Sequence, residues 1–175
     1  MKEIIIYTDG SSKGNPGPGG WASVVLFQNS GGQGKVWELG GREAHTTNNR
    51  MELRATIEAL HFVDKREELK KMPIIVHTDS AYVLNGITTW VYSWQKNGWR
   101  TADKKEVLNQ DLWKELLGLA MKFKLDRDLS WKKVAGHSGV EDNERCDVIA
   151  TSFADGERPM LFVGSIDNYL KYKAN

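Results

Sequence analysis

Four acidic side chains in this sequence stand where carboxylates can take part in chemistry. They are Asp9, Glu52, Asp79 and Asp147. Each lies at the end of a predicted strand or near the start of a predicted helix, and such side chains can converge at one edge of an α/β sheet. Four converging carboxylates repel one another and require cations, for which hard divalent ions such as Mg²⁺ are suited. Two such ions roughly 4 Å apart are a known device for in-line phosphodiester hydrolysis.

Each acid, taken singly, also has a purely structural interpretation. Asp9 before a glycine is typical of a turn, and Asp79 is typical of a helix N-cap. Glu52 forms a helix-start capping pair with Asn49 in this interpretation, and Asp147 is a first-turn acid favoured by the helix dipole. Against this, Glu52 and Asp147 share their helix faces with alanines, so both carboxylates point from packed faces rather than freely solvated ones.

The elements that must position these acids follow from the hydrophobic pattern. Short runs rich in β-branched and aromatic residues, bounded by Gly, Pro, Asn and Ser, predict five strands. They are residues 4–8, 21–28, 35–39, 74–77 and 129–134. The order of three strands, helix, strand, helical region, strand and helix predicts a mixed sheet covered by helices rather than a bundle or a sandwich.

The predicted helices share an apolar stripe at helical spacing. The first helix runs from Thr46 to Val63 and has a solvated end over 64–71, and the second is capped by Asp79–Ser80. The third begins at the N-cap Asn109 and buries Trp113, Leu116, Leu117, Ala120 and Met121. The last helix ends at Gly156. The glycine-rich run 14–20 predicts a tight connection between strands. No Gly-Lys-Ser/Thr follows it, which excludes a P-loop.

Composition places the chain among single soluble domains. It has 175 residues, a net charge of +1, 40% hydrophobic and 27% charged residues. Cys146 is the only cysteine, so an internal disulfide is excluded. The apolar runs are far shorter than the roughly 20 residues that cross a bilayer, and the N-terminus lacks a secretory signal. We therefore expect a cytoplasmic monomer without a membrane segment, in which any polyanion is held by a local basic patch.

The segment 90–105 provides such a patch. Its three tryptophans and one tyrosine alternate with cations, against the single acid Asp103. The cations are Lys96, Arg100, Lys104 and Lys105. Basic residues stiffened by packed rings form a platform for nucleic-acid phosphates. The structural alternative is a helix that packs through Trp90 and Trp94 and has a solvated polar face. Both interpretations hold together if the rings pack and the cations point outward.

Five strings, in order along the chain, resemble type 1 ribonuclease H of the bacterial kind. They are Tyr7–Ser11 with Gly14–Trp21, Thr46–Leu53, His77–Ser80, Gly98–Lys105, and Gly136–Gly139 with Asn143–Asp147. The resemblance implies the ribonuclease H fold, an α/β fold whose five-stranded mixed sheet, three antiparallel strands and then two parallel to the first, is flanked by helices. It also implies an endonuclease that hydrolyses the RNA strand of RNA/DNA hybrids and leaves 5′-phosphate and 3′-hydroxyl ends.

The resemblance further implies a role for each candidate catalytic residue. Asp9 is implied as the carboxylate shared by two Mg²⁺ ions, with Mn²⁺ as a possible substitute. Asp147 is implied as a ligand of the ion that activates water, and Glu52 and Asp79 as ligands of the ion facing the leaving group. His137 falls where the family has a histidine on a mobile loop. The resemblance implies that it handles a proton at the leaving oxygen or assists product release, and a near-neutral pKa suits either task.

Contacts to the hybrid are implied as well. Asn15, Asn48 and Asn49 match positions that touch the nucleic acid, and bonds to the 2′-hydroxyl or the minor groove let a protein distinguish RNA from DNA. The segment 90–105 matches the basic protrusion of the bacterial enzymes, which adds Trp90 and Trp99 to its four cations as hybrid-binding residues.

The match has boundaries and departures. We assign residues 1–156 to a ribonuclease H catalytic domain and 157–175 to a C-terminal tail without an interpretable motif. We expect no separate N-terminal hybrid-binding domain, because the matched strings begin close to residue 4. Ala81 stands where bacterial members often have glutamine, and Val140 replaces a common histidine. Neither is an implied metal ligand, so these departures predict altered affinity rather than loss of reaction.

Two other functions fit parts of the pattern. A non-catalytic hybrid-binding module on the same fold would keep the basic segment and lose carboxylates, whereas all four acids are present here. A DNA transposase or junction resolvase is a second alternative, since a fold alone does not fix function. Such enzymes are not expected to combine Asn48 and Asn49 with the basic protrusion.

Overall fold

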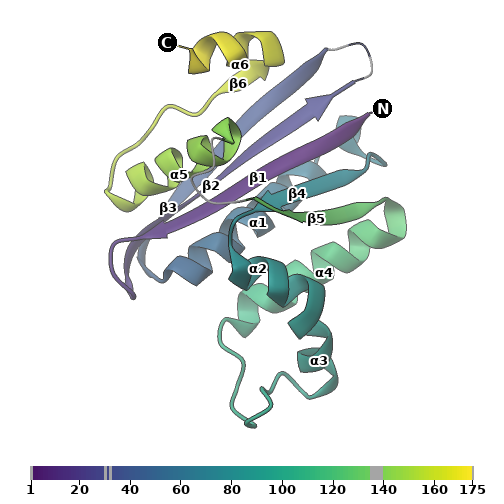
Figure 1. The fold of residues 1–175 in the computed structure, drawn as a ribbon, viewed down its shortest axis with the longest axis vertical. Coiled ribbons are helices and arrows are strands. Elements are labelled where there is room, and N and C mark those ends of the chain that lie inside the picture. Colours follow the sequence, from purple (N-terminus) through teal and green to yellow (C-terminus); the bar gives the residue numbers. More distant parts are fainter. Residues whose placement is uncertain (1, 30, 32, 135–139, 175) are drawn as a thin grey trace.

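The computed structural model describes residues 2–29, 31, 33–134 and 140–174 (Figure 1). The strands are β1 (Glu3–Ser12), β2 (Gly17–Gln28), β3 (Gly34–Thr46), β4 (Ile74–Thr78), β5 (Leu129–Lys133) and β6 (Val163–Ser165). The helices are α1 (Asn48–Asp64), α2 (Ala81–Asn85), α3 (Val91–Lys96), α4 (Gln110–Asp126), α5 (Glu141–Ala154) and α6 (Ile166–Lys173). A 3₁₀ turn (Glu67–Leu69) and a π-helical turn (Gly86–Trp90) complete them.

The strands form one mixed sheet in the order β5-β4-β1-β2-β3-β6. β1, β2 and β3 are antiparallel neighbours, and β4 and β5 run parallel to β1. This confirms the predicted arrangement of three antiparallel strands followed by two parallel ones. The prediction of five strands is wrong by one, because the tail adds β6, which pairs three residues with the free edge of β3.

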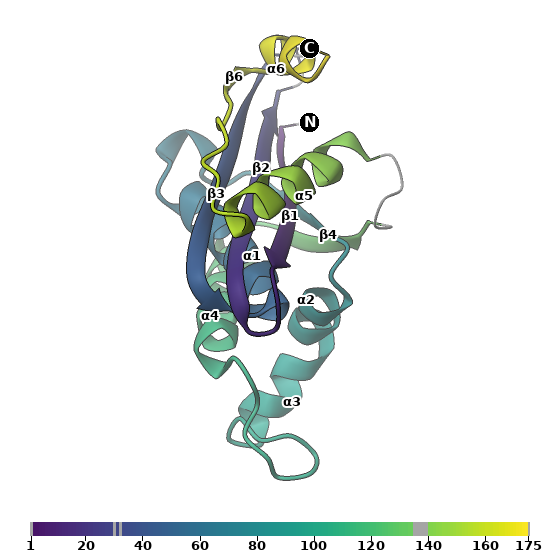
Figure 2. The ribbon, with the colours of Figure 1, turned by 90° about the vertical axis from the view of Figure 1, so that its left-hand side faces the viewer.

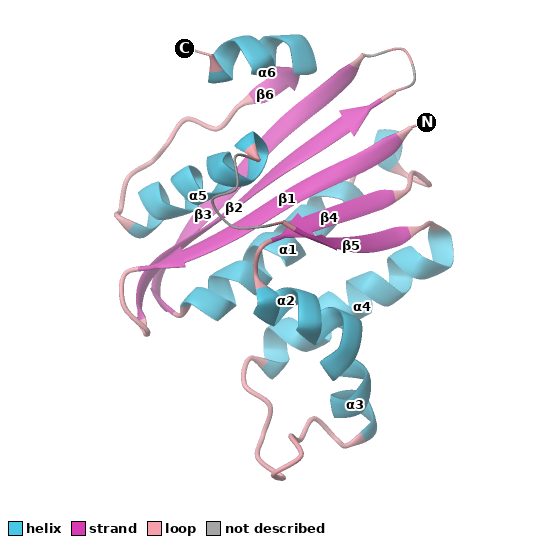
Figure 3. Ribbon diagram, in the orientation of Figure 1, coloured by secondary structure: helices cyan, strands magenta, loops and turns pink. Residues whose placement is uncertain are grey.

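Helices cover both faces of the sheet (Figures 2 and 3). On one face α1 and α4 bury a core that includes Leu53, Ile57 and Trp113. On the other face α5 and the tail bury a smaller core around Cys146 and Tyr169. None of the helices in the described ranges is long and apolar enough to cross a bilayer.

Three strands are several residues longer than predicted, and each extension contains glycine. β1 continues to Ser12 rather than ending at Thr8. β2 starts at Gly17 rather than at Trp21, and β3 continues to Thr46. A side chain at Gly20 would place its Cβ only 2.2 Å from the backbone oxygen of Ala150. Glycine in a strand often marks such a close approach of another backbone. The run 14–20 is therefore only partly a connection, and its second half belongs to the sheet under α5.

Three helix predictions need correction. α1 ends at Asp64, and Leu69 in the following turn is buried rather than solvated. Met121 does not belong to the buried stripe of α4, since it is 51% exposed and Phe123 is buried instead. Asn109 stands at the N-cap position of α4, but its side chain makes no capping bond. It accepts a bond from Arg50 and donates one to the Tyr82 hydroxyl instead.

The helix ending near Gly156 is not the last one, because the C-terminal segment 157–174 is ordered by its own contacts. Leu161, Phe162 and Ile166 pack on the core beneath α5, while the neighbouring Val163 remains exposed. The Ser165 hydroxyl caps α6 by accepting a bond from the backbone of Asn168. The C-terminal segment thus pairs with the edge strand β3 and adds apolar side chains to the core under α5. Figure 1 shows its β6 and α6 at the top of the molecule.

Candidate active site

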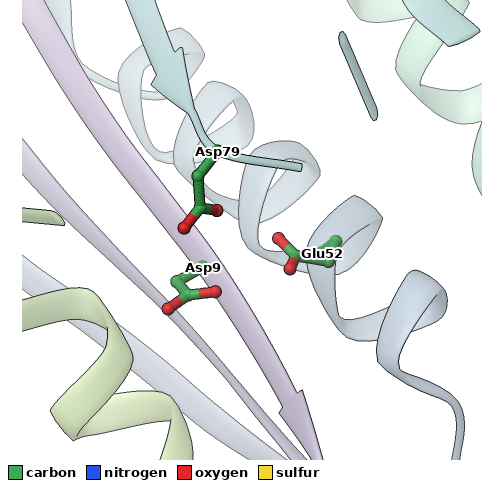
Figure 4. A group of neighbouring side chains, drawn as sticks. All are labelled: Asp9, Glu52 and Asp79. Atoms are coloured by element: carbon green, nitrogen blue, oxygen red, sulfur yellow. The ribbon is translucent and has the colours of Figure 1, made fainter. Parts of the chain in front are cut away.

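Three of the predicted acids meet beside the sheet. Asp9 comes from β1, Glu52 from the first turns of α1, and Asp79 follows the end of β4. Each offers a carboxylate oxygen within 4.8 Å of the others. Figure 4 shows the three side chains pointing toward one another. The prediction that strand ends and a helix start bring these acids together is confirmed for this group.

A close contact between α1 and β1 makes the group possible. A Cβ at Gly10 would lie 2.3 Å from the backbone nitrogen of Glu52, so only glycine allows the helix to come this near. One turn further along α1, the Ser23 hydroxyl on β2 donates a 2.7 Å hydrogen bond to the backbone oxygen of Ala55. Glu52 is therefore fixed beside Asp9 by backbone packing rather than by its own side chain.

The structural interpretations of the acids are wrong. Asp9 is paired within β1 and lies in no turn. Thr47, not Asn49, caps α1, and Ser80, not Asp79, caps α2. Since other side chains provide the caps, the carboxylates of Glu52 and Asp79 remain available for the site.

Asp147 lies across the site from this group. It is on α5 past the first turn, which begins at Glu141, so it is not a first-turn acid. A cavity of about 170 Å³ is lined by Asp147 together with Asp9, Glu52 and Asp79. All four predicted acids therefore face one small polar cavity, although only three lie within 4.8 Å of one another.

Amides flank the carboxylates. The Asn48 side chain donates a bond of 3.5 Å to Glu52, and the Asn143 side chain donates one of 3.4 Å to Asp79. Asn143 and Glu144 line the cavity but were not among the predicted site residues. Helical spacing was the signal that could have found Asn143, because it lies four residues before Asp147 and so on the same face of α5.

Burial and mutual repulsion dominate the electrostatics of the site. Asp9 is 8% exposed and Glu52 is 6% exposed. Desolvation, followed by the charge of Asp79, raises the pKa of Asp9 to about 7, although the Gly10 N–H, 2.7 Å from its carboxylate, acts in the opposite direction. Burial and the charges of Asp9 and Asp79 raise the pKa of Glu52 well above its ordinary value. Near neutral pH the group therefore holds protons unless a cation replaces them.

The donor set fits a hard divalent cation. It consists of carboxylate oxygens, with amide oxygens at its border, which are the ligands that Mg²⁺ and Mn²⁺ accept. Among the described residues, two buried oxygens in the cavity, Glu52 Oε2 and Asn143 Oδ1, have no hydrogen-bond partner. Buried polar atoms are normally satisfied, and a bound ion with its water ligands would satisfy these two.

Four predicted residues lie neither among the acids nor in the segment 90–105. Asn48 lines the cavity, and Asn49 is exposed in the first turn of α1. Asn15 is exposed in the connection between β1 and β2. His137 lies outside the described residues.

The segment 90–105 projects from the sheet with α3 and the loop that follows it (Figures 1 and 2). The ring centroids of Trp90 and Trp94 are 5.8 Å apart, and Trp94 packs on the buried Trp113. Packing and exposure thus coexist as expected, because the four cations are all exposed. One cation has a second task, since the Arg100 guanidinium donates to the backbone oxygen of Lys104 within the loop. Trp99 is half-buried and carries the Lys114 ammonium over its ring.

Comparison with known proteins gives the family. A family model described as RNase H matches residues 1–155. The chain belongs to the ribonuclease H family. A Ribonuclease H from Cyanothece sp. is 51% identical over 156 residues, which cover 89% of this chain and 92% of that protein. The chain is accordingly an enzyme, a ribonuclease H of the hydrolase class.

Solved ribonuclease H structures have the same fold as this chain. LC9-RNase H1, described as a type 1 RNase H with the type 2 active-site motif, has a TM-score of 0.81 at 28% identity, covering 100% of this chain and 82% of its own. LC11-RNase H1, solved in complex with an RNA/DNA hybrid, has a TM-score of 0.63 at 24% identity, covering 88% and 98%. The ribonuclease H fold expected from the sequence is therefore confirmed.

The repulsion among Asp9, Glu52 and Asp79 predicts that Asp9→Asn stabilises the metal-free ribonuclease H. The folded-state pKa of Asp9 is about 7, above its ordinary value of 3.8. The folded protein therefore holds a proton that the unfolded chain releases, so stability falls as pH rises between these values and stays low above them. At pH 8 with EDTA we expect the melting temperature to rise by about 5 °C. The gain should vanish below pH 4.

Differential scanning fluorimetry across pH measures this effect. The control is Asp103→Asn, which removes one charge from an exposed loop position and should change stability by less than about 0.5 kcal/mol. A lower melting temperature for Asp9→Asn at pH 8 would contradict the electrostatic account of the site.

Proposed function

We propose that this ribonuclease H hydrolyses the RNA strand of RNA/DNA hybrids with two divalent ions, leaving 5′-phosphate and 3′-hydroxyl ends. The observation that carries the proposal is the small cavity that Asp9, Glu52, Asp79 and Asp147 line together. A cavity with four carboxylates and few apolar atoms suits cations and a phosphate rather than an apolar ligand. Family membership selects phosphodiester hydrolysis among the reactions such a cavity supports.

The four acids divide the proposed work by position. The charges of both Asp79 and Asp147 raise the pKa of Asp9, so Asp9 is near both acids and is assigned to both ions. Glu52 and Asp79 are assigned to the ion on the leaving-group side, and Asp147 to the ion on the water side. Bound Mg²⁺, with Mn²⁺ as a substitute, supplies Lewis-acid activation of water and neutralises charge at the phosphate.

His137 is assigned to proton handling at the leaving oxygen or to product release. A histidine titrates near neutral pH, which allows it to give up and regain a proton during turnover. This role would accelerate the reaction without holding the ions, so it differs in kind from the role of the four acids.

Hybrid recognition is assigned to two surfaces. Asn48 and Asn49, at the start of α1, and Asn15, in the connection before β2, are exposed. We assign to them hydrogen bonds to the minor groove and to 2′-hydroxyls. The protrusion 90–105 is assigned to the DNA-strand phosphates through its four exposed cations, with Trp90 and Trp99 in support. The hybrid complex of LC11-RNase H1, which shares the fold, supports this substrate class.

The same proposal includes organisation and location. We assign catalysis to residues 1–156, of which 1–155 match the family model, and we expect the protein to act as a monomer in the cytoplasm. Ala81 and Val140, where relatives often carry glutamine and histidine, are expected to alter affinity for the hybrid.

A cleavage gel tests the function directly. Labelled RNA/DNA hybrid, double-stranded RNA and double-stranded DNA are incubated with and without Mg²⁺, and we expect cleavage of the hybrid RNA only, with Mg²⁺. Asp79→Asn and Asp147→Asn should each lower the rate by about 100-fold or more, because each removes a ligand charge from an ion whose contribution to the transition state is several kcal/mol. His137→Ala should lower it by about 100-fold or less and leave residual activity. Substantial activity in either aspartate variant would contradict the two-ion assignment.

The protrusion predicts a salt effect separable from chemistry. Lys96→Ala with Lys105→Ala removes two exposed cations, so KM should rise while kcat at saturating hybrid is kept. The slope of log affinity against log salt should fall by roughly 0.7 to 0.9 per lost phosphate contact. The matched control, Lys2→Ala with Lys65→Ala, removes two exposed lysines that lie outside the protrusion. A lower kcat with unchanged KM and salt slope would indicate a structural role for the protrusion.

A further inference from the structure

We propose that Arg145 is a positioning residue for the metal ligands on α5, and that the C-terminal segment 157–174 holds it in that role. This inference rests on the proposed function, because it concerns how Asp147 is presented to the ions. It also gives the segment, which extends beyond the family match at residue 155, a part in catalysis.

α5 is held from the side opposite the catalytic cavity. Asn143 and Asp147 line the cavity from one face of the helix. Arg145 is two residues from each of them, and helix residues two apart do not face the same way. Its guanidinium reaches Glu38 on β3 with two bonds, Nε to Oε1 at 2.7 Å and Nη2 to Oε2 at 2.9 Å. This paired geometry fixes the rotation of α5 about its axis, not only its distance from the sheet.

The pair is buried. The Glu38 side chain is fully buried and that of Arg145 is 20% exposed. A buried ion pair adds little net stability compared with an apolar pair of the same size, whereas its breakage leaves an uncompensated charge. What such a pair supplies is a defined geometry, and α5 is the element here whose exact placement matters for the cavity.

The C-terminal segment completes this network. Arg145 Nη2 also donates to the backbone oxygen of Met160 at 3.2 Å and to the Tyr172 hydroxyl at 2.8 Å. The backbone N–H of Phe162 donates to Glu38 Oε2 at 2.9 Å. Three groups of the segment thus hold a pair that joins the sheet to the catalytic helix.

A second clamp lies at the start of α5. Lys173 on α6 donates to Glu141 and to Asp142, both at 2.9 Å. These acids occupy the first turn of α5, about one and a half turns before Asp147. The segment therefore holds the helix at two points along its N-terminal half, the part that carries Asn143 and Asp147.

Metal sites are sensitive to such support. Residues that orient a ligand without touching the ion typically change metal affinity by about 10- to 100-fold when they are replaced. A small rotation of α5 would move Asp147 relative to Asp9 and Asp79, which are held by other elements. The expected consequence of loosening the pair is weaker ion binding with little change in the reaction once ions are bound.

The test is the double variant Glu38→Gln with Arg145→Met, which removes both charges and leaves no unpaired buried one. MnCl₂ is titrated into the protein without substrate by calorimetry, and Mg²⁺ is varied in the cleavage assay at saturating hybrid. We expect the Kd for Mn²⁺ to rise about tenfold and the Mg²⁺ concentration for half-maximal rate to rise in parallel. The kcat at saturating Mg²⁺ should stay close to that of the unchanged protein.

Two further variants separate positioning from stability. Leu69→Ala creates a cavity in the core on the other face of the sheet and should lower the melting temperature without changing the Kd for Mn²⁺. Tyr172→Phe removes one bond to Arg145 and should raise that Kd by a smaller amount than the double variant. If the double variant does not fold, the Kd of Tyr172→Phe for Mn²⁺ tests the inference alone.

Unchanged Mn²⁺ affinity in the folded double variant, or in Tyr172→Phe if only that variant folds, would overturn the inference and leave the pair a structural contact. If the unchanged protein binds Mn²⁺ and cleaves hybrids while the variants match it, only this inference fails. If the unchanged protein does neither, the proposed function fails first and this inference with it.

Discussion

Three carboxylates held within 4.8 Å of one another, two of them almost out of water, are the constraint on which the rest of this molecule depends. Desolvation and repulsion both disfavour the charged forms of the three carboxylates, so the site favours binding of positive charge. Protons neutralise the carboxylates in the metal-free protein, as the pKa of about 7 for Asp9 indicates. A divalent ion neutralises them better, because it brings two charges and accepts oxygen ligands.

The surrounding fold keeps these acids together against their repulsion. Gly10 lets α1 approach β1, and Ser23 ties the helix to the next strand. On the far side of the cavity, the pair between Glu38 and Arg145 fixes α5. These supports are a backbone contact, a hydrogen bond from a side chain to the backbone, and a buried ion pair, and none of them uses the carboxylates of the site. Because other contacts hold the fold together, the protein can keep the carboxylates close to one another although their repulsion is unfavourable.

The sequence predicted the acids better than it predicted their supports. Strand ends and helix starts are visible in periodicity, and the ordered strings fixed the topology, so Asp9, Glu52, Asp79 and Asp147 could all be named. Asn143 was missed because its role depends on which face of α5 meets the cavity. Asn109 was assigned a cap from its residue type alone, whereas its side chain makes tertiary hydrogen bonds to Arg50 and Tyr82 instead. Likewise β6 depends on pairing with a distant edge strand, which local propensity does not encode.

The most direct measurement of the central claim is the number of protons released when the protein binds Mn²⁺. Calorimetric titration in two buffers of different ionisation enthalpy, at about pH 6 and again at about pH 9, counts these protons. Because the pKa of Asp9 is about 7 and that of Glu52 is raised, ion binding should release about one proton or more at the lower pH and clearly fewer at the higher pH. Mn²⁺ binding without proton release at either pH, or no binding at all, would contradict the account.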